Sequence, residues 1–432
     1  MTDIQDNYFW PQAIALVDMN AFFASIEQHD KPALYGRPVA VTNGLLGTCI
    51  ITCSYEARRY GIHTGMRIKQ ARRLCPELVQ RPARPERYAE VSTNIMAALH
   101  DITPDVEIFS VDEAFLDITH CQRLWGPPEQ IARLIKNNIF ESSGLSCSIG
   151  ISGDKTTAKY AAKLQKPDGL TLIPPWETQE RLRDVPVTKL CGINVGIGAF
   201  LAKRGVFTCG DMEKLPVSVL ARRFGNPGRR IWQMCQGKDP EKVQNNINSP
   251  RSIGHSKVVP PKTTDRDLLY LYLIHMAEKV AARLRQHAMQ AQKYFIGLRC
   301  MHGWIGGRFK TEFSTNDSRL IIKLCKKTLH QSWHGEGVFQ VHVIALDPHL
   351  IKAQIDFFAK DNARSYRLNK AVDLVNERFG EFTLASSKLL ARSTMPNVIS
   401  PAWKPYGHRQ TIPGIKRRDD KPIIKKVTRI DS

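Results

Sequence analysis

Apolar residues in the first 174 positions alternate between strand-like runs and helix-like spacing. Residues 13–18 form a short apolar run that ends in Asp18, which predicts a buried strand with this acid at its C-terminal end. The elements predicted for this part are, in order, strand 13–18, helix 22–28, helix 87–100, strands 106–110 and 114–118, helix 129–141, strand 145–152, helix 155–166 and strand 170–174. This order predicts an α+β layer in which helices back an antiparallel sheet. Residues 36–85 are predicted to be irregular.

The two strands of the predicted hairpin are separated by three residues only, so a tight turn or a bulged hairpin should carry Asp112 and Glu113 at its tip. If this hairpin neighbours the first strand, Asp18 converges with them. Carboxylates packed closely raise one another's pKa, and a divalent cation removes that cost. Hard oxygen ligands in this number favour Mg²⁺, and two such ions would hold both oxygens of a phosphoryl transfer. The alternative is that these strand-end acids simply lie in solvent.

The rest of the chain predicts a helical region followed by a second α+β unit. Residues 178–247 have helical character, and 189–207 predict a helix, a tight glycine turn and a second helix. Backbone amides in such a turn can bind phosphate, although an ordinary glycine-capped hairpin gives the same pattern. A polar, proline-flanked stretch at 245–251 predicts a linker. The elements predicted beyond it are a helix at 266–287, strands at 294–301 and 338–346, and a helix around 368–379.

The composition is that of a globular chain with a large excess of basic side chains. The 432 residues carry 62 Lys and Arg against 41 Asp and Glu, a net charge of +21. Residues 251–432 hold 32 of the basic side chains but only 15 of the acidic ones. This asymmetry indicates a polyanionic partner, and without an apolar anchor or a basic amphipathic helix nucleic acid is favoured over an anionic membrane. A basic surface kept for solubility is the alternative.

Several protein classes are excluded by what the sequence lacks. No apolar stretch approaches the ~18 residues of a membrane span, and the acidic N-terminus does not match a signal peptide. None of the 10 cysteines form a C-x-x-C pair, so neither a zinc module nor a disulfide framework is predicted. A G-x-x-x-x-G-K-[ST] loop is absent, so a P-loop ATPase is not indicated. The interpretation is a cytosolic protein with reduced thiols.

Basic side chains that could bind phosphate accompany the three acids. Tyr55 and Arg58 lie in an arginine-rich segment, and Lys166 ends a helix whose lysines share one face. Arg binds phosphate through a forked pair of donors, whereas Lys acts as a point charge. Taken alone, these side chains are equally compatible with a solvated basic surface.

Four motifs make the sequence similar to a known family. They are VDMNAFFASIE (17–27), ITCSYEARRYGIHTGM (51–66), FSVDEAFLDIT (109–119) and LQKPDG (164–169). Their order and spacing resemble those of the Y-family translesion DNA polymerases, and most closely the DinB, or DNA polymerase IV, branch. The resemblance extends from about residue 13 to about residue 358.

The resemblance implies an α+β, multidomain right-hand architecture with a ferredoxin-like palm. The implied domains are a catalytic palm at 10–35 and 86–175, small fingers at 36–85, a helical, helix-hairpin-helix-like thumb at 176–247, an α+β little finger at 251–350, a clamp-binding peptide at 351–358 and a basic, partly disordered extension at 359–432.

The resemblance also implies roles for particular residues. Asp18, Asp112 and Glu113 would be the catalytic carboxylates that hold two Mg²⁺ ions, with the backbone carbonyl of Met19 as a further ligand. Phe23 would be the steric gate, an aromatic ring under the sugar that leaves no room for a 2′-hydroxyl. The residues expected to bind the dNTP are Phe22, Thr52, Tyr55, Arg58 and Lys166. Plain core packing is the alternative for the two phenylalanines.

Two positions depart from the DinB pattern. Asn20 stands where that branch usually has Asp, whereas the UmuC branch often has Asn there. This departure concerns the branch more than the chemistry, because the three main carboxylates remain. Asn194 stands where the thumb hairpin usually has the second Gly of G-[IV]-G, and Asn tolerates the left-handed region better than most residues. The second departure bears on phosphate binding at that hairpin.

A short peptide after the predicted little finger resembles bacterial sliding-clamp motifs. Its residues are Gln354, Ile355, Asp356, Phe357 and Phe358. An extended peptide with a glutamine and two apolar anchors suits a preformed apolar pocket, although a strand paired within the little finger is the alternative. The chain then continues for 74 residues that look like the extension of UmuC-like members.

The sequence therefore predicts a template-directed DNA polymerase that performs low-fidelity translesion synthesis in DNA damage tolerance. It would bind primer–template DNA, dNTPs and the sliding clamp, and it would act as a monomer at the nucleoid in the bacterial cytoplasm without membrane association. Three alternatives remain: a UmuC-like subunit that needs accessory proteins, a non-catalytic DNA- and clamp-binding module, and a nucleotidyl cyclase with a similar palm.

Overall fold

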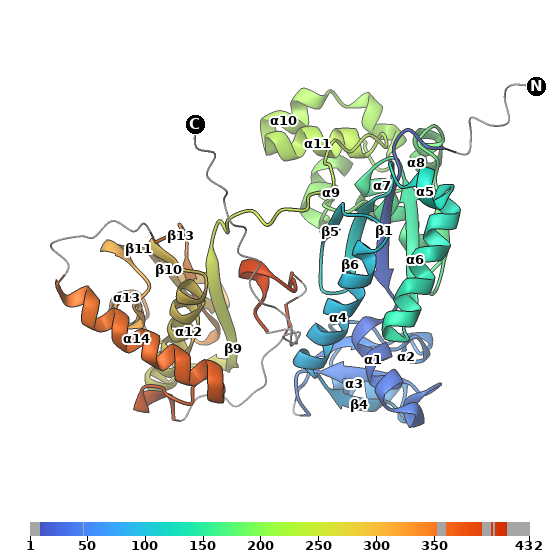
Figure 1. Ribbon diagram of the computed structural model, residues 1–432. Coiled ribbons are helices and arrows are strands. Elements are labelled where there is room, and N and C mark those ends of the chain that lie inside the picture. Colours follow the sequence, from blue (N-terminus) through green and yellow to red (C-terminus); the bar gives the residue numbers. More distant parts are fainter. Residues whose placement is uncertain (1–8, 46, 352–359, 391–398, 401, 413–432) are drawn as a thin grey trace, which may run out of the picture. The chain divides into compact units, whose positions relative to one another are not determined.

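The computed structural model describes residues 9–45, 47–351, 360–390, 399–400 and 402–412. The chain divides into two units (Figure 1). Unit 1 is Met1–Ile247 together with Met395–Ser432, and unit 2 is Asn248–Thr394. The division falls within the predicted linker at 245–251, and both units mix helices with sheets, which confirms the predicted α+β class.

A five-stranded sheet forms the centre of unit 1, in the order β5-β6-β1-β7-β8. Its strands are β1 (Ile14–Met19), β5 (Val106–Ile108), β6 (Glu113–Asp117), β7 (Cys147–Ser152) and β8 (Leu170–Leu172). Neighbouring strands are antiparallel except β7 and β8, which are parallel. Every residue of β1 and β7 is buried, as expected for central strands covered on both faces.

Helices cover both faces of this sheet (Figure 1). They are α1 (Phe22–Asp30), α4 (Pro85–His100), α5 (Gln122–Trp125), α6 (Pro128–Ser143) and α7 (Lys155–Leu164). Ala15 and Val17 share a core with α4 and α6, whereas Ile14 and Leu16 share one with α7, because successive strand side chains point to opposite faces. Gly150 on β7 is required for close packing, since an added Cβ would lie 2.2 Å from the backbone of α7.

Residues 36–85 are folded rather than irregular, so that prediction is wrong. They form a second sheet in the order β3-β2-β4, with two short helices and a core of their own. The elements here are β2 (Val39–Thr42), β3 (Ile50–Cys53), α2 (Tyr55–Arg59), α3 (Ile68–Leu74) and β4 (Val79–Pro82), and the 3₁₀ turn η1 (Pro32–Leu34) precedes them. Each strand has only four residues, which is too short for a clear period of two.

The helical prediction for 178–247 is confirmed. The elements are α8 (Thr178–Leu182), η2 (Val187–Lys189), α9 (Val195–Ala202), η3 (Gly210–Lys214), α10 (Val217–Phe224) and α11 (Asn226–Met234), and they enclose a separate apolar core. Asn194 does not use the left-handed conformation, since its φ is −80°. Its side chain instead accepts a hydrogen bond of 3.0 Å from the Ile197 amide and caps α9.

Unit 2 contains a five-stranded antiparallel sheet with helices on one face; four strands follow the order β11-β10-β12-β9, and the short β13 also pairs with β10. Its elements are β9 (Ile253–Thr263), α12 (Arg266–Gln286), β10 (Met289–Cys300), β11 (Gly303–Thr315), α13 (Ser318–Gln331), β12 (Val338–Ala345) and β13 (His349–Leu350). The predicted helix and both predicted strands are confirmed. Sequence analysis did not predict β9, β11 or α13. In β11, most of the exposed residues are glycine or charged.

The extension after residue 359 contributes to both units. It contains α14 (Lys360–Phe379), η4 (Ser387–Leu389) and η5 (Gly407–Arg409), which confirms the helix predicted around 368–379. The described residues from 360 to 390 belong to unit 2, and those from 399 to 412 belong to unit 1. The other residues of the extension, for which partial disorder was predicted, lie outside the described ranges. Within the described ranges, no helix is long and apolar enough to cross a membrane.

Candidate active site

The register of β1 and β6 brings the three predicted carboxylates together at one end of the unit 1 sheet. Asp18 and Glu113 are directly opposite each other across the two strands. The Met19 amide donates a hydrogen bond of 3.0 Å to the Asp112 carbonyl, which places Asp112 beside the same strand end. In β1 the buried apolar run precedes Asp18, and in β6 it follows Glu113, so both acids lie at the same end of the buried strand pair.

The site is buried enough to change how its acids ionise. Burial raises the pKa of Asp18 to about 6; the negative charges of Glu113 and Asp112 also raise it, and the Lys166 ammonium opposes the rise. Burial likewise raises the pKa of Asp112, against the opposing effect of a hydrogen bond from the Ser110 hydroxyl. That bond, from Ser110 Oγ to Asp112 Oδ1, is 2.6 Å long. The acids therefore repel one another in a poorly solvated site.

Two lysines neutralise part of this charge. Lys159 Nζ lies 2.8 Å from each carboxylate oxygen of Glu113, and Lys166 Nζ forms an ion pair with Asp18 Oδ1. The three acids are neighbours, but among the residues that the structure describes no group of three His, Cys, Asp or Glu side chains is arranged so that it could hold a metal ion as it stands. The available donors are nevertheless oxygens only, which is the ligand set of a hard divalent cation. The chemistry of the donor set thus fits such an ion.

Three of the predicted nucleotide-binding residues, Thr52, Tyr55 and Arg58, lie in the 36–85 region. Ser54 caps α2, which begins at Tyr55, and the Arg58 guanidinium lies 4.6 Å from the centre of the Tyr55 ring. Burial raises the pKa of the Tyr55 hydroxyl, Arg58 lowers it, and the charge of Asp18 raises it further, which places Tyr55 within electrostatic reach of Asp18. Thr52 lies on β3, half-buried, opposite residue 41 of β2.

The two phenylalanines at the start of α1 have different environments. Phe22 is a buried core residue. Phe23 is only half-buried, and its ring stacks on Tyr88 with centroids 4.2 Å apart and an angle of 11°. The Tyr88 hydroxyl donates a hydrogen bond of 3.0 Å to Glu27, whose carboxylate also lies 2.7 Å from Arg84 Nε. The Phe23 ring therefore rests on a side chain that is itself held in place.

Sequence analysis missed several residues that position the site. Ser110 and Tyr88 were not predicted to contribute, and Lys159 was noted only as one of the lysines on a helix face. Ser110 could have been suspected from its place two residues before Asp112, where short side chains often bond the backbone or side chain ahead. Tyr88 and Lys159 gave no local signal, because their partners lie 46 or more residues away in the chain.

Asn20 has a structural role at the edge of the site. Its side chain is buried. It donates a hydrogen bond of 3.0 Å to Ser146 Oγ and accepts one of 2.9 Å from Ser148 Oγ. The amide thus donates to one hydroxyl and accepts from the other, whereas an ionised Asp could only accept hydrogen bonds. The predicted clamp-binding residues Gln354, Ile355, Phe357 and Phe358 lie outside the described residues.

Comparisons with known proteins agree with these features. Residues 17–163 match the impB/mucB/samB family, and residues 250–354 match the C-terminal domain of that family. A DNA polymerase IV of Moorella thermoacetica is 36% identical over 378 residues, which are 85% of this chain and 94% of the relative. A DNA polymerase IV of Desulfatibacillum aliphaticivorans is 33% identical over 380 residues, 87% and 96% of the two chains.

A solved structure gives the same result for the fold. A Y-family DNA polymerase chimera superposes with a TM-score of 0.68 at 25% identity, over 78% of this chain and 100% of the chimera. Enzymes of this family use divalent metal ions, in agreement with the oxygen-only donors at the ends of β1 and β6. The chain therefore belongs to the impB/mucB/samB family and is a DinB-type Y-family DNA polymerase, a DNA-directed enzyme of translesion synthesis.

Proposed function

We propose that the acids at the ends of β1 and β6 hold two Mg²⁺ ions while a nucleotide passes from a dNTP to the 3′-hydroxyl of a primer. The observation that carries this proposal is the register that sets Asp18 opposite Glu113, with Asp112 adjoining. The Met19 carbonyl would complete the ligand set. When bound, the ions would stabilise the charge that develops on the attacking and leaving oxygens.

The neighbouring basic residues would hold the triphosphate. Lys166 already reaches the Asp18 carboxylate, so its ammonium lies where the phosphates would approach. Arg58 presents a planar guanidinium that suits a forked contact with phosphate oxygens, and its stacking over Tyr55 supports its orientation. Thr52 and Tyr55 would add hydroxyl donors from the same region. Such positioning supplies much of the rate in phosphoryl transfer.

The separate apolar cores support the proposed domains. We assign the palm to 10–35 and 86–175, the fingers to 36–85, the thumb to 176–247 and the little finger to 251–350. The sheets and helices of these segments enclose four main clusters of buried side chains. The three carboxylates come from one chain, which supports a polymerase that works as a monomer.

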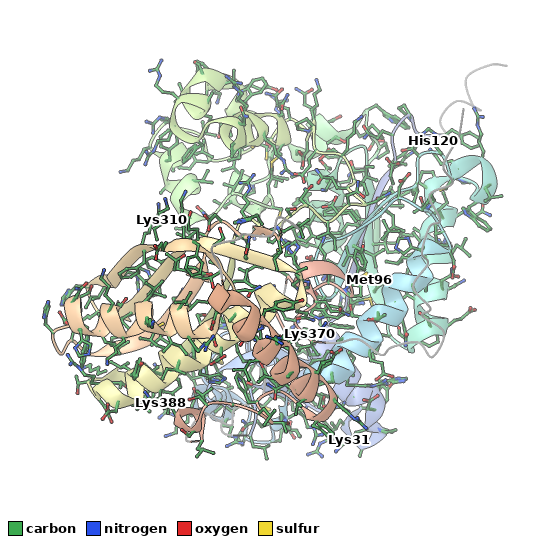
Figure 2. The ribbon with its side chains drawn as sticks, turned by 60° about the vertical axis from the view of Figure 1, so that its left-hand side comes forward. Lys31, Met96, His120, Lys310, Lys370 and Lys388 are labelled. Carbon is green, nitrogen blue, oxygen red and sulfur yellow. The ribbon has the colours of Figure 1, made fainter. Side chains whose placement is uncertain are left out.

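The open face of the unit 2 sheet is the proposed DNA-binding surface of the little finger. Residues 294, 296 and 298 of β10 are buried under the helices, so Arg299 points to the other face with its cross-strand partner Trp304. The exposed basic side chains on this face are Lys293, Arg299, Arg308 and Lys310, the last of which is labelled on β11 in Figure 2. Phosphate contacts from such side chains bind DNA without reading its sequence.

The proposed clamp peptide has a direct test. Changing Phe357 and Phe358 together to Ala should abolish binding to the bacterial sliding clamp, because the two rings would supply most of the apolar contact. Distributive primer extension without the clamp should stay at the parental rate. Clamp binding can be measured by surface plasmon resonance, with Tyr366→Ala on α14 as the control. Undiminished binding of the double variant would remove the clamp from the proposal.

Primer extension by the purified protein tests the proposed function as a whole. Protein, primer–template and dNTPs should give extended product in Mg²⁺, and an excess of chelator should abolish it. Extension past a lesion that blocks replicative synthesis is expected without accessory subunits. A parallel reaction with one nucleoside triphosphate and no DNA should yield no cyclic product. Extension that survives the chelator would contradict the proposed metal chemistry.

A further inference from the structure

The C-terminal extension is anchored firmly on unit 2. The carboxylate of Asp373, on α14, lies 2.6 Å from Arg285 Nε and 2.7 Å from its Nη2, and Arg285 belongs to α12. Leu389 is fully buried beside α12, and the Lys388 ammonium lies 5.3 Å from the centre of the Tyr270 ring. Figure 1 shows α14 running along this unit, and Figure 2 labels Lys388. The extension is therefore fixed to unit 2 up to residue 390.

The same extension has a second anchor, on unit 1. Trp403 is completely buried, and Ile399 and Ile412 are nearly so. All three belong to the apolar core that contains β1 and α4. The Trp403 indole Nε1 donates a hydrogen bond of 3.1 Å to the Ile412 carbonyl, which closes residues 403–412 into a loop. We call residues 399–412, of which 401 is not described, the C-terminal segment.

The linker that leads out of unit 1 is fixed to the same sheet. The buried carboxylate of Asp239 accepts a hydrogen bond of 2.6 Å from Thr156 at the start of α7 and is paired with Arg230 at 2.8 Å. Further along, the Gln244 backbone amide donates a hydrogen bond of 2.8 Å to the Glu107 carboxylate on β5. Residues 239–245 are therefore held down until shortly before the chain passes into unit 2.

The C-terminal segment lies beside this linker. An added Cβ at Gly407 would lie 2.6 Å from the Ile247 side chain, so this side chain packs directly against the Gly407 backbone. Lys404 lies within electrostatic reach of Glu107 and of Lys155, and burial lowers its pKa. The outgoing linker and the returning segment thus meet at one place on unit 1.

We propose that the C-terminal segment is a returning strap, docked on unit 1 through the packing of Trp403, that gives unit 2 a second attachment to unit 1 beside the first. With one attachment, unit 2 would sample many orientations and would lose that freedom on binding DNA. A second attachment at the same place removes part of the freedom in advance and so raises affinity for primer–template. This inference rests on the DNA-binding role proposed for unit 2.

Cutting the strap tests the inference in the full-length protein. A protease recognition sequence is inserted after residue 394, at the boundary between the units, and the protein is assayed before and after cleavage. The cleaved C-terminal fragment should co-elute with the rest of the protein in gel filtration, because Trp403 remains docked. Affinity for primer–template should fall by on the order of threefold, as for a doubling of loop length. Single-turnover incorporation at saturating DNA should not change.

A substitution provides the second arm. Trp403→Ala in the uncut protein should release the segment and lower DNA affinity to the same extent, and cleavage of this variant should cause no further loss. Trp176→Ala, at a half-exposed tryptophan of unit 1, is the matched control and should leave affinity unchanged. Equal DNA affinity before and after cleavage would show that the strap does not contribute to DNA binding. Loss of the fragment on cleavage would show that the C-terminal segment is not docked on unit 1.

A third variant separates this inference from the role on which it rests. The double change of Arg299 and Arg308 to Ala should weaken DNA binding in the uncut protein. If DNA binding is not weakened, unit 2 is not the DNA-binding part. A threefold loss of affinity on cleavage would then have another cause, and the proposed effect of the strap would be overturned. Co-elution of the fragment reports on docking in either case.

Discussion

Asp112→Asn should slow single-turnover nucleotide incorporation by on the order of 10³-fold without loss of affinity for primer–template. Removal of one preorganised electrostatic contact commonly costs about 10² to 10³ in rate, and a carboxylate that holds a cation in the site belongs at the upper end. Asp112 lies beside the strand pair that sets Asp18 opposite Glu113.

The choice of asparagine separates lost catalysis from lost folding. Asn keeps an oxygen that can accept the 2.6 Å hydrogen bond from Ser110. It also removes a buried carboxylate whose pKa burial raises, so the variant should unfold at the same temperature as the parent or a higher one. Glu113→Gln is designed in the same way, since it keeps an acceptor for Lys159, whereas Ala would leave that ammonium buried and unpaired.

A control is available at the far end of the same unit. Asp101 is an exposed acid at the end of α4, and Asp101→Asn should extend primers at the parental rate. Rapid-quench measurement of one incorporation event, with folding followed by circular dichroism, provides both readouts. If Asp112→Asn and Glu113→Gln both extend a primer as fast as the parent, these acids are not the site, and the catalytic residues must be sought elsewhere.

The acids at the ends of β1 and β6 could be predicted because the information is local. An apolar run that ends in Asp18 predicts a strand with an acid at its end, and a three-residue gap between two strands predicts the turn that carries Asp112. Only the assumption that the hairpin lies beside the first strand concerned residues distant in sequence. The pairing of β1 with β6 confirms it. Short-range patterns were therefore sufficient for the main features of the site.

The side chains that support these acids could not be predicted, because their partners are distant in sequence. Tyr88 reaches Glu27 across 61 residues, and Lys159 reaches Glu113 across 46. Trp403 is a more extreme case: it follows a proline-containing stretch without helical or strand periodicity, yet it is completely buried. Isolated apolar residues in a basic tail give no periodic signal, so only tertiary structure shows that such a segment is docked.

Phe23→Ala should admit ribonucleotides, lowering discrimination between dNTP and rNTP by on the order of 100-fold. A close-packed side chain that would overlap a single added oxygen contributes about 1–3 kcal/mol of selectivity. A tenfold change in the discrimination ratio corresponds to about 1.4 kcal/mol. Phe23 suits this role because its ring is half-buried and stacked on Tyr88, so it has little freedom to move aside. Phe22, by contrast, is a core residue, and its removal should mainly cost stability.

The measurement is the ratio of kcat/KM for a matched dNTP and rNTP on one primer–template. Phe23→Tyr is the control, because it keeps the ring and should keep the ratio. Loss of the ring also removes an aromatic pair contributing about 0.5–1.5 kcal/mol of stability, so dNTP incorporation should fall modestly in the alanine variant. A general loss of packing would slow both nucleotides alike, whereas a gate must change their ratio. An unchanged ratio in Phe23→Ala would mean that another group excludes the 2′-hydroxyl.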